Sequence, residues 1–546
     1  MPRYRTTFLD EISAYPRVRQ LVYTGAVLFF LALILVPPIF GIGLKWSLVG
    51  EITGDPTLMS RAANATWASF AVAVFVSTID LIVGIPMAWF IVRRRTRWIG
   101  IVDTLADIPF VVPTVALGYS LRLFWSDPQG VSSLFGQSVV STGWVLVTLL
   151  HFVFSFPVIV RVMVGSLLDY QLTLEEASRT LGASTFTADR TITFPILKPS
   201  LIGAFMLAFA RSISETGATI MVAGTNFENG AIFVKNMRDT NQQGALVFVS
   251  LVLIIVSCAI FGVILTLGSR LRLPMRRVFP SFERRLSSRT ASASRDITTL
   301  AIFFLLIIIP SLFVALPTAN AIMDGTIGNA FSSSGVWQDY WSSIGLSYLV
   351  GGMATILSVI AGLPMAVLIA RRRMGKAVSA ILDTLVNIPI IVPSTALGAS
   401  LSIFWENFGF MPEMILLVLA HLSITYSYFV RSMTAAIERT DIELENAARI
   451  HGARPFTVFR TIILPLTKYS LLAGAIMVLT RSVSETGATL AVVSNLRTAP
   501  VLLVDWVRGT IPATASEVGL GCGILIILSF IVLLFLKIGT GRKAVY

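Results

Sequence analysis

The sequence predicts an all-α membrane protein of about 12 transmembrane helices, arranged as two parallel six-helix repeats. Two observations lead to this fold class. The 546 residues are 55% hydrophobic and only 13% charged, whereas a soluble domain carries roughly 25% charged residues. In addition, the stretch from Glu175 to Gly217 recurs 270 positions later, from Glu445 to Gly487, without an insertion. We therefore interpret the chain as a tandem duplication of one membrane unit.

Apolar runs of about 20 residues, the length that crosses a bilayer, predict the individual helices. In the first repeat these runs lie at 21–43, 64–92, 104–125, 141–165, 200–222 and 245–267. In the second repeat they lie at 299–316, 342–370, 384–405, 413–433, 470–494 and 517–537. The first run is too long for a cleaved signal peptide and is expected to be retained. The predicted domains are a transmembrane domain at 1–268, a basic linker at 269–296 and a second transmembrane domain at 297–546.

Basic residues predict the orientation of these helices. Of the 42 Lys and Arg residues, 33 lie in seven segments between alternate helices, at 1–20, 93–101, 161–200, 269–296, 371–380, 431–468 and 537–546. The positive-inside rule makes these segments, and with them both termini, cytoplasmic. The formal charge of +13 then reflects topology and anionic lipid, and no nucleic-acid partner is predicted because no basic domain exists. The linker is expected to be a flexible cytoplasmic tether without a folded element.

An even number of helices per repeat gives both repeats the same orientation. Two such repeats are related by a pseudo-twofold axis along the membrane normal, which predicts a transport pathway on that axis. In the third helix of each repeat, prolines stand four residues apart, Pro109 with Pro113 and Pro389 with Pro393. They must bend or interrupt the helix, which a bilayer tolerates only where protein or a cavity covers the freed carbonyls. The third helices are therefore expected inside the bundle, and a kink that serves packing alone is the alternative.

Histidines and cysteines offer few candidate ligands. His151 and His421 are predicted to open the fourth helices on the outer side, as a ligand or proton relay or in an interfacial structural role. The structural role is favoured because no carboxylate stands beside either histidine in the sequence. Cys258 and Cys522 have no metal-like spacing and are expected to pack as small apolar residues. No metal site is predicted.

A moderately polar stretch separates the fourth and fifth helices. Leu174, Ala177 and Leu181 share one helical face and Gly182 follows as a stop signal, which predicts a short amphipathic helix shaped for docking. The motif Glu176-Ala177-Ser178, then Gly182, Ile192 and Phe194-Pro195, is similar to the EAA loop of binding-protein-dependent ABC importers. With its second copy, the whole chain resembles two fused permease domains of the type I kind, as in iron(III)- and thiamine-type fused permeases.

The resemblance implies that each EAA loop forms a coupling helix that inserts into a cleft on a separate ATPase subunit. The implied coupling residues are Glu175, Glu176, Ala177, Gly182, Glu445, Asn446, Ala447, Ala448 and Gly452. Asn446 stands where the family has its glutamate, with Glu445 one residue earlier. This departure puts the charged contact of the second loop with the ATPase in question, but the loop itself is kept.

The fifth helices carry charges where a bilayer makes them costly. The residues are Arg211, Glu215 and Gly217, repeated as Arg481, Glu485 and Gly487. Each Arg–Glu pair either lines a gate or pathway, where arginine could attract an anion, or forms an i,i+4 salt bridge within the helix. The glycines permit a helix break or a close approach and favour the gate. This segment also resembles molybdate, tungstate and sulfate permeases.

The sequence contains no Gly-x-x-x-x-Gly-Lys-Ser/Thr loop, so ATP is expected to be bound by a partner and not by this chain. The resemblance implies a non-enzymatic, multi-pass permease subunit in a prokaryotic inner or plasma membrane. The implied partners are an ATPase dimer on the cytoplasmic side, an extracytoplasmic solute-binding protein and the lipid bilayer. The favoured substrate is a small oxyanion such as molybdate, tungstate or sulfate. The alternatives are iron(III), thiamine or another small solute, and an ion-coupled 6+6 secondary transporter. A membrane enzyme or channel is not supported, because the sequence shows no catalytic or metal-binding set of residues.

Overall fold

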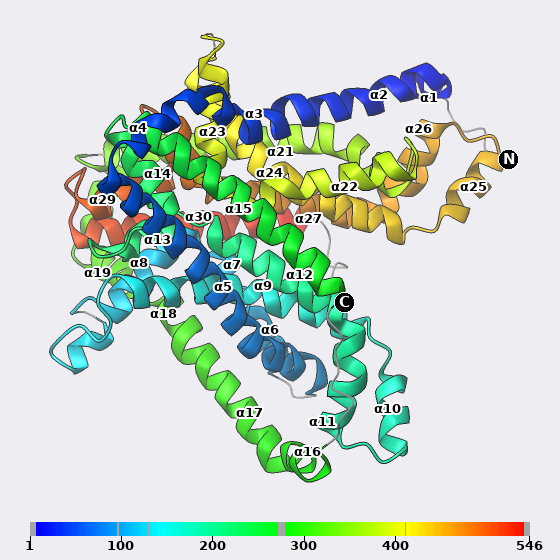
Figure 1. Cartoon of the computed structure of the whole chain (residues 1–546), viewed down its shortest axis with the longest axis horizontal. Coiled ribbons are helices and arrows are strands. Elements are labelled where there is room, and N and C mark those ends of the chain that lie inside the picture. Colours follow the sequence, from blue (N-terminus) through cyan, green and yellow to red (C-terminus); the bar gives the residue numbers. More distant parts are fainter. Residues whose placement is uncertain are drawn as a thin grey trace.

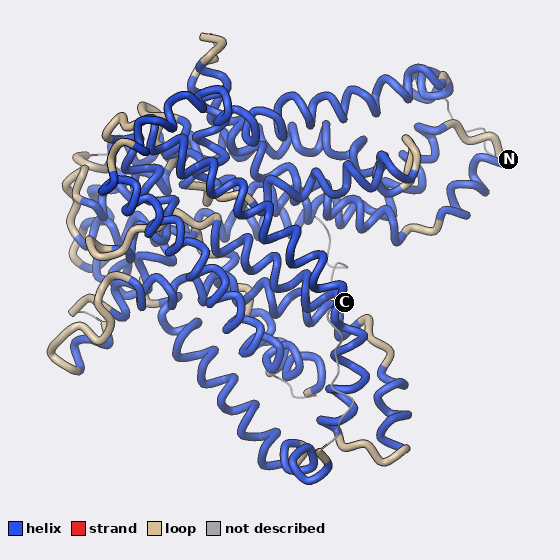
Figure 2. Tube along the Cα trace, in the orientation of Figure 1, coloured by secondary structure: helices blue, strands red, loops and turns tan. Residues whose placement is uncertain are grey.

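The computed structural model describes residues 7–94, 98–128, 130–270, 279–332, 334–409 and 411–539, and within these ranges it contains helices and loops without a strand (Figure 2). The predicted all-α class is confirmed. The basic residues at 1–6, 95–97, 271–278 and 540–546, which the topology prediction used, lie outside the described residues.

Residues up to 270 form α1 to α15. Their bounds are α1 Phe8–Ala14, α2 Pro16–Phe29, α3 Val36–Phe40, α4 Val49–Thr53, α5 Pro56–Arg93, α6 Ile99–Leu105, α7 Ile108–Val111, α8 Thr114–Trp125, α9 Trp144–Leu168, α10 Leu172–Thr180, α11 Thr185–Ala188, α12 Phe194–Ile213, α13 Gly217–Ala223, α14 Gly230–Asp239 and α15 Gln243–Arg270.

Residues from 280 onward form α16 to α30. Their bounds are α16 Pro280–Leu286, α17 Arg289–Ile302, α18 Ile309–Leu312, α19 Ala315–Met323, α20 Thr326–Ser332, α21 Trp337–Ala370, α22 Lys376–Ile391, α23 Ser394–Glu406, α24 Glu413–Arg439, α25 Ile442–Ile450, α26 Pro455–Val458, α27 Leu464–Val483, α28 Gly487–Val492, α29 Ala499–Arg508 and α30 Ala515–Gly539. Short π-helical turns make α2–α3, α11–α12, α17–α18 and α26–α27 continuous.

Ten helices in the described ranges are long and apolar enough to cross a membrane. The two remaining predicted spans, 104–125 and 384–405, are broken pairs, bent by 104° between α7 and α8 and by 105° between α22 and α23. The bends fall at the paired prolines, so the predicted interruption of the third helices is confirmed. The helices after the bends, α8 and α23, are almost entirely buried, which confirms their expected place inside the bundle.

The first membrane helix of each repeat packs on the other repeat. Helices α2 and α3 contact α21 and α23, whereas α17 and α18 contact α5 and α8. The exchange is fixed by serine hydroxyls that hydrogen-bond the backbone of each first membrane helix beside its prolines, where the regular helical hydrogen bonding is interrupted. Ser400 donates to the carbonyl of Pro37 at 3.3 Å, and Ser120 donates to that of Pro310 at 2.7 Å.

The helices form two arms that join at one end and diverge at the other (Figure 1). One arm contains α1, α2, α22, α25 and α26. The other contains α6, α10, α11, α16 and α17. Helices α10 and α25 therefore lie at the ends of different arms, far from the region where the repeats meet.

The predicted linker differs from expectation. Its residues 280–286 form α16, and its residues 289–296 begin α17, so a flexible tether is wrong for this part. The serine-rich sequence caps a helix, because the Ser288 side chain accepts a hydrogen bond from the amide of Ala291 at 3.2 Å. Burial of Glu283 against the first repeat fixes α16 in place. The linker residues 271–278 lie outside the described residues.

Candidate gate and coupling sites

Each predicted fifth helix is interrupted beside its glycine. Helix α12 ends at Ile213 and α13 starts at Gly217, and in the second repeat α27 ends at Val483 and α28 starts at Gly487. The glutamate inside each break caps the helix that follows. Glu215 accepts a hydrogen bond from the Ala218 amide at 3.1 Å, and Glu485 accepts one from the Ala488 amide at 3.0 Å. Both glutamates are buried, so the break is a built feature and not a frayed end.

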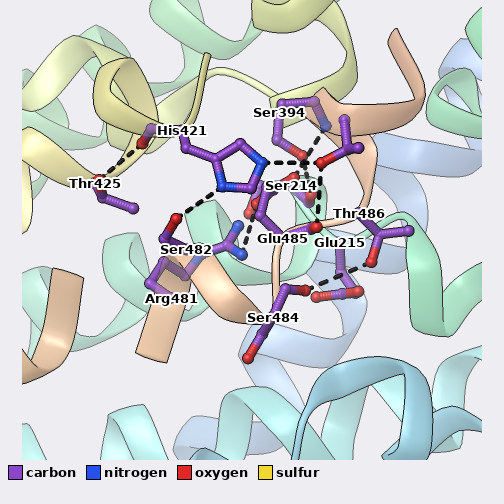
Figure 3. A network of polar contacts seen from close by, with 12 residues as sticks. Ser214, Glu215, Ser394, His421, Thr425, Arg481, Ser482, Ser484, Glu485 and Thr486 are labelled. Atoms are coloured by element: carbon purple, nitrogen blue, oxygen red, sulfur yellow. Dashed lines mark hydrogen bonds and ion pairs between the residues drawn. The ribbon is translucent and has the colours of Figure 1, made fainter. Parts of the chain in front are cut away.

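A histidine from the fourth helix spans each break. The two ring nitrogens of His151 lie 2.8 Å from Ser212 Oγ and 2.9 Å from Thr219 Oγ1. His421 lies 2.7 Å from Ser482 Oγ and 2.9 Å from Thr489 Oγ1 (Figure 3).

Because each ring ties the end of one helix to the start of the next, the favoured structural role of the histidines fits these contacts. Their interfacial placement is wrong: both rings are buried in the protein interior, and both fourth helices begin earlier, at Trp144 and Glu413.

The two breaks meet each other where the repeats join. A Cβ atom on Gly217 would lie 2.7 Å from Thr486 Cβ, and one on Gly487 would lie 2.6 Å from Thr216 Oγ1. Ser394 at the start of α23 donates to the carbonyl of Ser214 at 3.0 Å and so joins the second repeat to the first break (Figure 3). The glycine backbone thus lies so close to the side chains of the opposite break that a Cβ atom on either glycine would force a neighbour to shift. The segments 214–217 and 484–487, which we call the gate segments, therefore close against each other.

The two arginines behave differently although their sequence motifs match. Arg481, near the end of α27, pairs at 2.6 Å with Glu485 in the break that follows. Arg211 has no ion pair among the described residues, and its guanidinium lies 5.5 Å from the centre of the Phe154 ring. The residue that corresponds to Phe154 is Ile424, which offers no aromatic face. The two interpretations of the Arg–Glu motif are a salt bridge and a cation that lines a gate or pathway, and both remain. The second repeat forms the salt bridge, whereas the first repeat has a cation without an ion pair among the described residues.

The stretches 171–193 and 441–463, which we call the coupling loops for the role that the resemblance implies, have the same construction. Gly182 has a φ of +93° and Gly452 one of +82°, a backbone conformation that favours glycine. Burial in the two helices is also the same: Glu175 and Glu445 are buried, whereas Glu176, Ala177, Asn446 and Ala447 are exposed and Ala448 is half-buried. Asn446 therefore changes the exposed face of the second loop and leaves the buried glutamate in place.

Arginines at the end of the second membrane helix of each repeat hold the buried glutamates. Arg93 pairs with Glu175 at 2.6 Å, and Arg371 pairs with Glu445 at 2.8 Å. Arg449 adds a second contact to Glu445 at 3.0 Å. Sequence analysis used these arginines only as topology signals and missed their role as anchors. Their matched positions in the two repeats, each ahead of a loop with a matched glutamate, were the available signal.

Glu445→Ala is expected to destabilise the protein by about 2–3 kcal/mol, because it leaves a buried cation without its carboxylate. Only 6% of the Arg371 side chain is exposed. Glu175→Ala is expected to cost about 1 kcal/mol, since 22% of the Arg93 side chain is exposed and water can replace the partner. Thermal unfolding of the purified variants in detergent measures both effects. Glu443→Ala, at an exposed position of the same helix, is the control, and equal losses for Glu445 and Glu175 would contradict the assignment.

Sequence analysis also missed a buried acid in the first repeat. Asp80 on α5 is fully buried, and Ser155 on α9 donates a hydrogen bond to it at 2.5 Å. The corresponding residue of the second repeat is Ser358, which is buried as well. A carboxyl group inside the predicted run 64–92 was visible in the sequence, and the cost of such a group in a membrane was the signal that could have singled it out.

Comparison with known families agrees with this architecture. The family model described as "Binding-protein-dependent transport system inner membrane component" matches the chain twice, at residues 80–272 and 359–539. The two matches together cover more than half of the chain. Each contains one coupling loop and one gate segment, and neither contains the first membrane helix of its repeat.

Individual relatives are similar to about one repeat. "Sulfate transport system permease protein CysT" of Salmonella typhimurium is 28% identical over 245 residues, which is 42% of this chain and 85% of the relative. The CysT protein of Escherichia coli K12 is 27% identical over 245 residues, with 42% and 85% covered. A "Probable sulfate transport system permease protein cysT" of Chlorokybus atmophyticus is 29% identical over 220 residues, 39% of this chain and 75% of the relative. The chain therefore belongs to the inner-membrane permeases of binding-protein-dependent ABC importers and carries two copies of the permease unit.

Proposed function

We propose that this chain forms the whole membrane pathway of an ATP-driven importer for a small oxyanion, with sulfate as the first candidate. A separate ATPase dimer binds the two coupling loops on the cytoplasmic side, where both termini lie, and a solute-binding protein docks on the outer side. The observation that carries the proposal is mechanical. One continuous helix of 29 residues, Thr185–Ile213, runs from the base of the first coupling loop to the first gate segment, and Pro455–Val483 does the same in the second repeat.

Such a helix is about 44 Å long at 1.5 Å per residue, and its α-helical and π-helical parts follow one another without a break, so it can transmit displacement. Closure of an ATPase dimer would draw the coupling loops together, and α12 and α27 would carry that motion to the gate segments. Only a partner whose binding energy differs between the two states can drive the change. The diverging arms correspond in this scheme to the state before closure, with the gate shut.

The oxyanion assignment is supported by the first repeat. Arg211 brings a cation to the helix that ends at the first gate segment, and no carboxylate of the described residues lies within ion-pair distance of it. A guanidinium group offers several N–H donors in a fixed plane, a geometry suited to sulfate and related tetrahedral anions. The relatives are named as sulfate transport permeases, and sulfate belongs to the same substrate class. Iron(III) and thiamine lack this support, because a cationic site does not favour either of them.

The test is ATP-dependent uptake into proteoliposomes. The permease is purified from its native membrane together with its bound subunits and reconstituted with the solute-binding protein. Uptake of radiolabelled sulfate is expected to require ATP on the side of the coupling loops. It is expected to continue when proton and sodium gradients are collapsed. Uptake that follows an ion gradient without ATP would refute the proposal in favour of a secondary transporter. ATP-driven uptake of iron(III) or thiamine in place of an oxyanion would refute the substrate assignment.

A further inference from the structure

Two short helices outside the family matches hold the bases of the coupling loops. Helix α1 contacts α26, and α16 contacts α11; both contacts are visible in Figure 1. Each short helix precedes the first membrane helix of one repeat but lies on the coupling loop of the other repeat. The arrangement is therefore crossed, as it is for the membrane helices that follow.

The contacts of α16 involve three sites on the first coupling loop. Glu283, which is 2% exposed, accepts a hydrogen bond from the Thr187 hydroxyl. The same carboxylate pairs with Arg190 at 2.8 Å. One helical turn later, the Ser287 hydroxyl accepts a hydrogen bond from the Phe186 amide at 3.0 Å. A buried carboxylate and a hydroxyl thus fix the first turn of the helix that leads to the gate.

The contacts of α1 involve the equivalent three sites on the second coupling loop. Asp10, which is fully buried, accepts a hydrogen bond from the Thr457 hydroxyl at 2.7 Å and lies 3.9 Å from Arg460. The Ser13 hydroxyl accepts a hydrogen bond from the Phe456 amide at 3.1 Å. Each of these loop residues stands 270 positions after its counterpart in the first loop.

The two short helices share these contacts without sharing a sequence. Asp10 and Ser13 are three residues apart, whereas Glu283 and Ser287 are four apart, and the carboxylates differ in length. An incidental contact would not recur at three equivalent sites in unlike helices. The hydrogen bond from Thr457 lowers the pKa of Asp10 to about 2, and the one from Thr187 lowers the pKa of Glu283. Both carboxylates are therefore charged at neutral pH and attract their arginines.

We propose that α1 and α16 are crossed braces, each of which fastens the base of one coupling loop to the first membrane helix of the opposite repeat. Asp10 and Glu283 are positioning residues for coupling. This inference rests on the proposed function and adds a second route for force. Motion of one loop reaches the gate through its own fifth helix and, through the brace, also moves the first membrane helix of the other repeat. The two repeats must then move in concert.

A cross-link tests whether brace and loop move as one body. Ser184 Oγ and Ser287 Oγ lie 3.0 Å apart, so the double variant Ser184→Cys, Ser287→Cys is suited to a disulfide. It is made in a Cys258→Ala background, because Cys522 is fully buried. The oxidised double variant is expected to keep more than about half of the ATP-driven uptake of the same variant in its reduced form, in which the Ser287 hydroxyl is already absent. Uptake that is lost on oxidation and restored by reduction would show that the brace must release, and would overturn the proposal.

Charge removal tests the positioning role. Glu283→Gln and Asp10→Asn are expected to leave ATPase binding intact while uptake per ATP hydrolysed falls about tenfold, since a charged hydrogen bond becomes a neutral one. Glu11→Gln is the control, because this neighbouring carboxylate is 62% exposed and its contact with Arg454 of the second coupling loop, at 3.9 Å, is a weak surface ion pair. Unchanged uptake per ATP in both variants would overturn the proposal.

The inference can fail separately from the proposed function. If the unaltered protein shows no ATP-driven uptake, the proposed function fails, and the brace is then judged by hydrogen exchange. Glu283→Gln must in that case increase amide exchange in residues 184–193 relative to the Glu11→Gln control. Unchanged exchange would show that Glu283 does not fasten the loop and would overturn the brace itself.

Discussion

Replacing Arg481 by alanine is expected to lower the free energy of unfolding by about 3–5 kcal/mol, because it leaves Glu485 as a buried carboxylate without its cation. Arg481 lies 2.6 Å from Glu485, and only 2% of the glutamate side chain is exposed. Arg211→Ala is the matched variant in the other repeat. It removes a cation that has a ring contact but, among the described residues, no ion pair, so the expected loss is about 1 kcal/mol. Thermal unfolding in detergent measures the difference between the two variants.

For uptake of sulfate, the same two variants are expected to show the opposite order: Arg211→Ala should lose more activity than Arg481→Ala. Arg211→Ala should reduce uptake of sulfate per folded molecule about tenfold, because it removes the one cation of the pair that is free to attract an anion. Arg211→Lys, which keeps the charge, should retain more activity. Uptake normalised to folded protein separates this effect from instability. Equal losses of stability for the two alanine variants would contradict the asymmetry between the repeats.

Alanine at either gate glycine is expected to prevent closure of the gate. The added methyl group of Gly487→Ala would lie 2.5 Å from Ser394 Oγ and 2.6 Å from Thr216 Oγ1, and that of Gly217→Ala would collide with Thr486. Overpacking of this kind costs about 1–3 kcal/mol, which lowers the population of the closed state roughly 5- to 160-fold. We expect leakage of sulfate from loaded proteoliposomes in the absence of ATP, together with loss of ATP-driven accumulation.

The chain offers a matched control for this effect. Gly203 lies on α12, one end of which carries the gate segment, and a Cβ atom there would meet nothing within 4 Å. Gly203→Ala should therefore retain a tight membrane and normal uptake. A tight membrane with Gly487→Ala would refute the assignment of segments 214–217 and 484–487 as the gate.

Much of this architecture could be predicted because short stretches of sequence determine it. Apolar run length identified the spans, and the paired prolines at 109, 113, 389 and 393 identified the bends, since both signals act on the backbone itself. The matched glycines, 217 and 487, indicated a break or a close approach, and the structure has both. The functional roles of the gate and coupling residues stay predictions until the variants described above are measured.

Other features depend on contacts between distant segments and left no pattern to read. Asp10 and Thr457 are 447 positions apart, and no periodicity connects them. The different states of Arg211 and Arg481 accompany a difference on a neighbouring helix, Phe154 against Ile424. A search for identical motifs emphasised what the repeats share and so concealed this difference. The linker was misjudged because its serines and arginines are equally typical of tethers and of capped amphipathic helices.

The exchange of first helices bears on how the protein is made. The Ile42 amide donates its hydrogen bond to Ser400, which is 358 residues later in the chain. At a synthesis rate of about 5–20 residues per second, the ribosome needs roughly 20–70 s to supply that partner. During this interval the nascent first helix lies in lipid with a kinked backbone that lacks this hydrogen bond. The helices of the second repeat on which it later packs do not yet exist. A chaperone or the insertion machinery that shelters it would be needed most before the second repeat emerges, and premature termination should leave a fragment marked for degradation.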